Sequence, residues 1–245
     1  ISVTGVQTCA LPIFAGGTVV HITAGVAALA AALMVKRRDE PEQTPNQIPL
    51  VLTGTGLLWF GWFGFNGGSS LAANAQAVQA FLTTNTASAA AMLTWMFLDW
   101  YYRGKPSVVG ASIGAVVGLV AITPAAGYVS VLSSLLIGII SPVVSYYVVR
   151  WRARANIADT LDVFPCHGVG GMVGMILTAV FAQEGGVITG QWKLLGLHIV
   201  GLAVVAIYTF TVTSAGLWLI RRVTGHIAVP EFNREIGLRG LDRKS

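Results

Sequence analysis

The chain has 245 residues, of which 54% are hydrophobic and only 10% are charged, with a mean hydropathy of +0.71. Soluble domains carry roughly 25% charged residues, so a chain this apolar cannot enclose its side chains in a globular core and is predicted to lie in a lipid bilayer. The net charge of +5 would suggest nucleic-acid binding only if the basic residues clustered on a folded surface. They fall between apolar runs instead, so we expect no nucleic-acid partner.

Seven apolar runs follow one another along the chain, each close to the roughly 20 residues that cross the hydrocarbon core as a helix. They predict helices at about 14–35, 48–71, 76–101, 107–122, 129–150, 162–182 and 194–220. We therefore predict an all-α polytopic membrane protein, with a transmembrane domain over residues 14–222 and a tail over residues 223–245.

The basic residues give the orientation of these spans. If the segment after the first span is cytoplasmic, 14 of the 15 Lys and Arg residues lie on the cytoplasmic side, and only Lys193 lies outside. This asymmetry is what the positive-inside rule predicts. The first span then begins outside and the C-terminus is cytoplasmic, in the plasma (inner) membrane of a cell.

The two ends of the chain resemble non-biological sequence. The stretch VTGVQTCALPI (residues 3–13) matches a translation of the reverse complement of a common short-read sequencing adapter, and DRKS at residues 242–245 matches the forward adapter. We therefore expect residues 1–13 to be an artefact that flanks a genomic fragment, with the last residues artefactual as well. This interpretation removes Cys9 from functional arguments and leaves Cys166 without a metal-ligand pattern, so we expect no metal and no cofactor.

Ionisable side chains inside the predicted spans are few, and each is a functional hypothesis because charge is costly in lipid. They are His21 in the first span, Asp99 near the end of the third, Asp162 and His167 in the sixth and His198 in the seventh.

His21 and His167 both lie among small residues, in GGTVVHITAG and CHGVGGMVG, and small residues let helix backbones approach closely. Across such a contact, one neutral imidazole can donate a hydrogen bond and the other can accept it. In the alternative arrangement each ring separately bonds a backbone carbonyl. His198 has no polar neighbours in LLGLHIVGLAVV, which favours a structural role.

The stretch GASIG (residues 110–114) matches the G-x-S-x-G pattern of serine hydrolases. That motif needs a strand-to-helix turn above an α/β sheet, whereas this stretch lies inside an apolar run, which favours a glycine packing face. An intramembrane serine hydrolase that uses Ser112 and His167 is the enzyme alternative, and we expect the chain not to be an enzyme.

Four stretches in order carry a resemblance to one family: FAGGTVVHITAG, GWFGFNGGSS, RGKPSVVGASIGAVVGLVAITPAAGYV and DVFPCHGVGGMVG. Together they resemble the ammonium transporter and Rhesus-protein family, and the bacterial ammonium transporters more than the Rhesus branch. The similarity covers about residues 14–241. It implies an eleven-helix inverted-repeat channel fold, assembled as a homotrimer with a pore in each subunit. On that plan the chain holds spans five to eleven.

The resemblance also implies roles for particular residues. His21 and His167 correspond to the family's twin pore histidines, Phe65 to one of two phenylalanines that gate the outer entrance, and Ser69 to a member of the outer cation-recruitment site. Asp162, five residues before His167, matches a helix-start aspartate that supports the cation site.

The implied activity is transport of ammonium or ammonia, with deprotonation of the recruited cation on the outer side. The alternative within the family is an ammonium sensor or receptor. A further implied partner is a cytoplasmic PII-type regulator, which the segment at residues 36–47 and the basic tail would face. Because half of the inverted repeat is missing, we expect the fragment alone to be inactive.

The family's first-repeat aspartate should lie eight residues before its histidine, which here is position 13, the last adapter residue. We expect the organism's gene to encode aspartate at this position instead of Ile13. A longer contig or an independent read across codon 13 will check this, and an isoleucine codon in native flanking sequence would contradict it.

Overall fold

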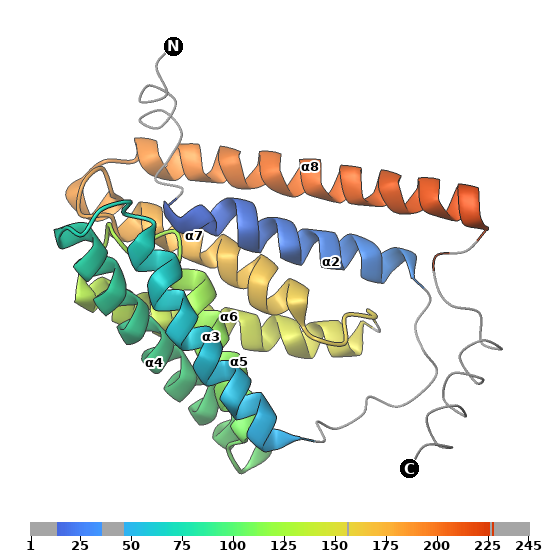
Figure 1. Cartoon of the computed structure of the whole chain (residues 1–245), viewed down its shortest axis with the longest axis horizontal. Helices are drawn as coiled ribbons and strands as arrows, with labels where there is room; N and C mark the ends of the chain where they lie inside the picture. The colour runs from blue at the N-terminus through green and yellow to red at the C-terminus, as the bar shows by residue number, and fades with distance from the viewer. Residues whose placement is uncertain (1–13, 36–46, 156, 226, 228–245) are drawn as a thin grey trace.

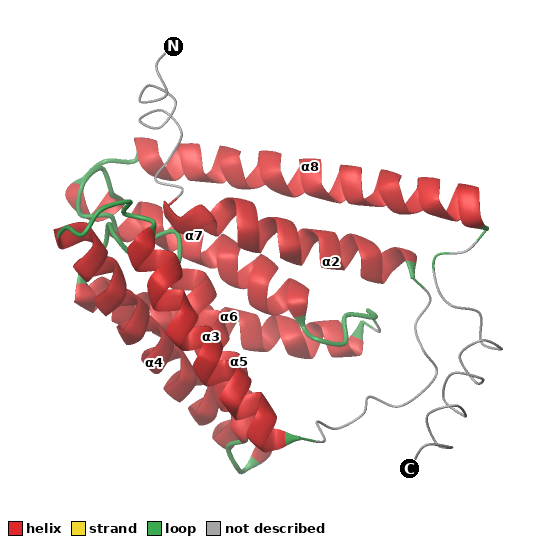
Figure 2. Ribbon diagram, viewed as in Figure 1, coloured by secondary structure: helices red, strands yellow, loops and turns green. Residues whose placement is uncertain are grey.

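The structure is a computed structural model that describes residues 14–35, 47–155, 157–225 and 227. Within these ranges the chain is almost entirely helical, as Figure 2 shows, and an isolated antiparallel bridge between Val129 and Ala182 is the single β-type pairing. The all-α fold predicted from the sequence is therefore confirmed. The segments at residues 1–13, 36–46 and 228–245 lie outside the described residues, and so do the sequence expectations that concern them.

The predicted spans correspond to the helices closely. The two histidine-bearing spans each consist of a short irregular helix followed by an α-helix. The elements are η1 (Phe14–Gly16), η2 (Gly17–Ile22), α2 (Thr23–Met34), α3 (Ile48–Gly68), α4 (Ala75–Arg103), α5 (Val108–Ile122), α6 (Val131–Arg154), η3 (Phe164–Val169), α7 (Gly170–Phe181), η4 (Val187–Thr189) and α8 (Lys193–Thr224).

Helix starts and ends follow from local sequence signals. Asn74, Ser107 and Ser130 precede α4, α5 and α6, and each side chain accepts a hydrogen bond from the backbone N–H three residues later. Gly104 and Gly225 end α4 and α8 in the left-handed conformation that glycine adopts without steric cost. The predicted boundaries accordingly lie within a few residues of the observed ones.

The helices form two groups that cross each other (Figure 1). The long α8 lies along α2 at one side, α7 runs beneath α2, and α4, α5 and α6 form a second group that α3 covers. Helix α5 contacts α3, α4, α6 and α7, so it lies at the centre of the bundle. In contrast, Asn66 is the single buried residue of α3.

By length and apolar composition, five segments of the described chain qualify as membrane spans: Phe14–Met34, Ile48–Gly68, Val131–Arg154, Phe164–Phe181 and Lys193–Thr224. Helices α4 and α5, which the sequence also predicts as spans, do not meet both criteria, α5 because of its length and α4 because of its polar side chains. Helix α5 has only 15 residues, most of them buried. Helix α4 carries polar side chains that bond across to neighbouring backbone, such as Thr83 to the Ala126 carbonyl at 2.7 Å and Ser88 to the Ala115 carbonyl at 3.0 Å.

Glycines of α5 form the contact with α4. A Cβ on Gly114 would lie 2.5 Å from Trp95 Cβ and 2.8 Å from the Ala91 carbonyl oxygen, and a Cβ on Gly118 would lie 2.6 Å from Ala91 Cβ. The GASIG stretch is thus part of a helix-packing face, as the sequence indicates. The neighbouring Ser112 lies within α5 and not on a strand-to-helix turn.

We expect Gly114→Ala to destabilise the protein by about 1–3 kcal/mol, because the added methyl group overpacks the α4–α5 contact. Thermal unfolding of the purified protein in detergent will measure this. Gly216→Ala in α8 is the matched control, since a Cβ there meets nothing within 4 Å. Equal melting temperatures for the two variants would contradict the packing role.

Candidate functional site

Both histidines lie in a π-helical turn at the start of a span. His21 is in η2 and His167 is in η3, and each turn continues directly into an α-helix, α2 and α7 respectively. π-Helical turns are rare and occur frequently at functional sites, because the extra residue changes which side chains face inward. The two candidate residues thus share the same unusual backbone environment.

The two histidine-bearing helices cross with their backbones in contact. A Cβ on Gly25 would overlap the backbone N and Cα of Gly168, and a Cβ on Gly171 would lie 3.1 Å from His21 Cβ. Gly25 and Gly171 each follow their own histidine by four residues, so each lies one helical turn further on and faces the other helix's histidine region. The crossing is therefore reciprocal, and it depends on glycine on both sides.

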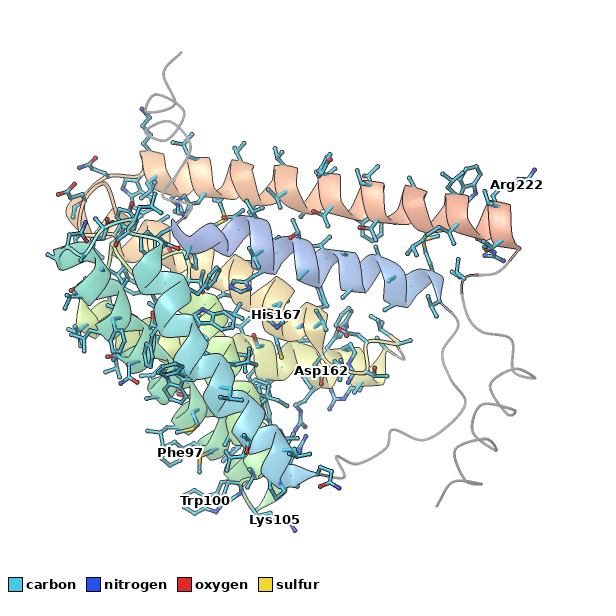
Figure 3. All side chains as sticks on the ribbon, in the orientation of Figure 1. Phe97, Trp100, Lys105, Asp162, His167 and Arg222 are labelled. Carbon is cyan, nitrogen blue, oxygen red and sulfur yellow. The ribbon has the colours of Figure 1, made fainter. Side chains whose placement is uncertain are left out.

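This crossing brings the two imidazoles together. His21 Nδ1 and His167 Nδ1 are 3.4 Å apart, and the ring centroids are separated by 5.5 Å with a tilt of 37°. His21 is 2% exposed, whereas His167 is half-buried. Figure 3 shows His167 in the interior of the bundle. Of the two arrangements that the sequence allows, the structure has the paired one.

Two further side chains hold the His21 ring. Trp62 of α3 stacks on it, with centroids 5.3 Å apart and planes 14° from parallel. Thr123, at the end of α5, places Oγ1 3.3 Å from His21 Nε2 and also receives a hydrogen bond from Trp62 Nε1 at 2.9 Å. His21 is thus fixed on three sides, by a ring face, a hydroxyl and the other histidine.

The predicted gate and recruitment residues lie on α3 and just after its end. Phe65 is 37% exposed and presents an edge-to-face contact to His21, with centroids 6.4 Å apart, and a similar contact to Trp62 at 5.7 Å. Ser69 follows α3 and donates its hydroxyl proton to the Phe65 carbonyl at 2.7 Å. The Ser69 oxygen therefore keeps lone pairs that can accept an N–H from a cation.

At the start of η3, the capping carboxylate is Asp159. Its Oδ1 accepts a hydrogen bond from the Val163 N–H at 3.0 Å and its Oδ2 accepts one from the Phe164 N–H at 2.7 Å. Asp162, which the family resemblance matches to a helix-start aspartate, forms an ion pair with Arg152, with Oδ1 2.8 Å from Nε. In Figure 3 it lies near the loop between α6 and η3, away from His167 along the bundle.

The remaining candidates have other surroundings. His198 is buried and bonds the Met175 carbonyl through Nδ1 at 2.6 Å, which links α8 to α7 and agrees with the structural role predicted for it. The Ser112 hydroxyl has no hydrogen-bond partner among the described residues, so no base contacts it there. Asp99 is buried and accepts a hydrogen bond from Ser107 at 2.9 Å, which ties α4 to the start of α5.

The sequence model of the Ammonium Transporter Family matches residues 4–240 of the chain. The chain belongs to this family. Among its relatives, an ammonium transporter of Aquifex aeolicus is 46% identical to the chain over 218 residues, which cover 86% of this chain and 52% of that protein. The family match begins inside residues 1–13, and the adapter origin of that segment stays a prediction.

Solved structures show the same arrangement of helices. The crystal structure of Candida albicans Mep2 is 39% identical, with a TM-score of 0.86 over 92% of this chain and 54% of that one. A structure titled "Sensor Amt Protein" is 32% identical, with a TM-score of 0.78 over 86% of this chain and 55% of that one. The chain thus spans about half the length of these relatives, and it is a multi-pass membrane protein of the ammonium transporter family.

Sequence reasoning missed three residues of this site. Trp62 lies one helical turn before Phe65, and this spacing could have placed both on one face of α3. Asp159 lies eight residues before His167, the same spacing that the family resemblance implies between the first-repeat aspartate and His21. Thr123 carries no comparable signal, because its contact with His21 arises only where the end of α5 meets η2.

In a transporter of this family, Gly25→Ala should separate the two histidine helices, because the methyl group has no space against Gly168. We expect lower thermal stability, by about 1–3 kcal/mol, and loss of the hydrogen bond between the rings. A structure of the variant and its melting temperature will measure both effects. Gly196→Ala, on α8 with open space around the glycine, is the control and should change neither.

Proposed function

We propose that the full-length protein conducts ammonium or ammonia through a narrow apolar pore that His21 and His167 line. The observation that carries this proposal is the contact between the two imidazoles, whose Nδ1 atoms are 3.4 Å apart. The membership of the chain in the ammonium transporter family supports it. The two rings carry hydrogen-bonding nitrogens in the interior of the bundle, so they would stabilise a small polar solute on its way through the membrane.

The energetics favour passage of the neutral species. An unpaired ion in an apolar medium costs tens of kcal/mol in the Born limit, whereas a neutral molecule loses only its hydrogen bonds to water. Ammonium can give up its proton, and ammonia can then replace its lost water hydrogen bonds at the histidine ring nitrogens. Deprotonation of the recruited cation therefore belongs on the outer side, before the histidines.

The outer side of the proposed path contains Phe65 and Ser69. An aromatic face attracts a cation by about 0.5–2 kcal/mol, and the Ser69 oxygen can accept an N–H from it. Phe65 contacts His21 edge to face, so its side chain is suited to act as the gate between the recruitment site and the histidines. Asp162, in its ion pair with Arg152, would support the second histidine helix from the inner side.

Several properties of the whole protein belong to the same proposal. By its family resemblance it would be a homotrimer in the inner membrane, with the start of this chain outside and the C-terminus in the cytoplasm. A PII-type regulator would bind on the cytoplasmic side. It would act as a transporter and not as an enzyme.

An ammonium sensor is the second candidate, because one similar solved structure is titled "Sensor Amt Protein". A sensor and a transporter both need to bind the cation, but only a transporter needs a continuous path. Uptake of ammonium by liposomes that contain the full-length protein separates the two candidates, since a sensor without transport activity gives no flux above protein-free liposomes.

His21→Ala in the full-length protein should lower ammonium or methylammonium flux by about tenfold, which corresponds to about 1.4 kcal/mol at the barrier. Stopped-flow measurement on proteoliposomes will quantify it. Val19→Ala changes an exposed residue of the same π-helical turn and should leave the flux unaltered. Flux through His21→Ala equal to that of the unsubstituted protein would refute the pore role.

A further inference from the structure

The hydroxyl group of Thr123 has three hydrogen-bond partners. Its Oγ1 lies 2.7 Å from the Leu119 carbonyl oxygen, 2.9 Å from Trp62 Nε1 and 3.3 Å from His21 Nε2. A threonine hydroxyl has one proton to donate and two lone pairs to accept with. Thr123 is fully buried, so water does not compete for these contacts.

Chemistry fixes the direction of two of the three bonds. A carbonyl oxygen can only accept, so the single hydroxyl proton points to Leu119. An indole N–H can only donate, so one lone pair of Thr123 accepts from Trp62. The remaining lone pair faces His21 Nε2, and all three contacts are satisfied only when His21 donates. His21 therefore carries a proton on Nε2.

The position of the proton on His21 also determines the donor in the hydrogen bond between the two histidines. A neutral imidazole with a proton on Nε2 has a lone pair on Nδ1, so His21 Nδ1 is an acceptor. The bond between the two Nδ1 atoms then requires His167 to be the donor. His167 in turn keeps its lone pair on Nε2, for which the described residues provide no hydrogen-bond partner.

We propose that Thr123 is a positioning residue that sets which nitrogen carries the proton in both pore histidines. In the resulting chain, His167 Nδ1 donates to His21 Nδ1, His21 Nε2 donates to Thr123, and Thr123 donates to Leu119. His167 Nε2 is then the ring nitrogen that accepts an N–H from ammonia. This last assignment rests on the proposed function, whereas the positions of the protons do not.

The protons can be located directly by ¹⁵N NMR of the full-length protein with ¹⁵N-labelled histidine in lipid bilayers, at an alkaline pH where the rings are neutral. Protonated and bare ring nitrogens have distinct shifts, and the variants His21→Asn and His167→Asn assign them. We expect His21 to be protonated on Nε2 and His167 on Nδ1, each in a single form. The opposite assignment, or a mixture of forms, would overturn the proposal.

Matched variants test whether Thr123 is the cause. Thr123→Val keeps the shape and removes the hydroxyl, so the single form should give way to a mixture. Thr123→Ser keeps the hydroxyl and should preserve the single form, and Trp62→Phe, which removes the other donor to that hydroxyl, should preserve it too. Unchanged proton positions in Thr123→Val would show that Thr123 does not set them. If that variant does not fold, the unsubstituted spectrum still decides the direction of the chain.

Flux measurements keep this inference distinct from the proposed function. If the spectra give the assigned proton positions but His21→Ala conducts normally, the pore function fails and the role of Thr123 stands. If His21→Ala abolishes conduction but the spectra show mixed forms, the role of Thr123 fails and the pore function stands.

Discussion

The site depends on the close crossing of the two histidine-bearing helices, which glycine residues allow. Gly25 and Gly168 bring their backbones into contact, and only this separation allows rings on both helices to meet at their Nδ1 atoms. A side chain at Gly25 would overlap the backbone of Gly168 and move the helices apart, which would weaken the contact between the two rings. Close helix packing at this crossing is thus the condition for the contact between the two histidines.

Around this crossing the protein supplies hydrogen bonds that fix the orientation of the two histidines. Trp62 and Thr123 hold His21 from α3 and α5, while Asp159 caps η3 and so holds the helix that carries His167. The charged residues Arg152 and Asp162 pair with each other at one end of the bundle. The side chains that contact the two rings, Trp62 and Thr123, are neutral, whereas the charged residues Asp159, Asp162 and Arg152 lie before or at the start of η3. Keeping charge away from the rings lowers the free-energy cost of a polar site within the membrane.

Much of the fold could be predicted because hydropathy reports directly on membrane spans. The predicted range 107–122 corresponds to α5 within one residue. Hydropathy does not indicate which spans lie in the interior of the bundle. The burial of α5 and the hydrogen bonds that α4 makes to neighbouring backbone could therefore not be predicted from it. In the same way, the pairing of His21 with His167 was one of two readings, since small neighbours permit a crossing without specifying its partner.

Prediction from the sequence has a second limit, which concerns the turns between helices. The contacts of Thr123 show it, and so does the capping of η3 by Asp159 while Asp162 pairs with Arg152. Both depend on how the chain turns between helices, and the backbone at Asp162 is in the left-handed region, with φ of 52°. That turn directs its side chain to Arg152 and leaves the cap to Asp159. Spacing in the sequence suggests which residues are near a helix start, but the turn decides which of them faces the backbone N–H groups.

The π-helical turns impose an unusual constraint on evolution of the chain. A π-helical turn holds one residue more than an α-helical turn, so losing a single residue from η2 or η3 would convert it into regular α-helix. The helix on either side would keep its orientation, because the turn absorbs the missing residue, but the side chains inside the turn, His21 or His167 among them, would face in new directions. Point substitutions at exposed positions such as Val19 leave this geometry intact. At exposed positions such as Val19, these two segments should therefore tolerate a change of residue type better than a change of length.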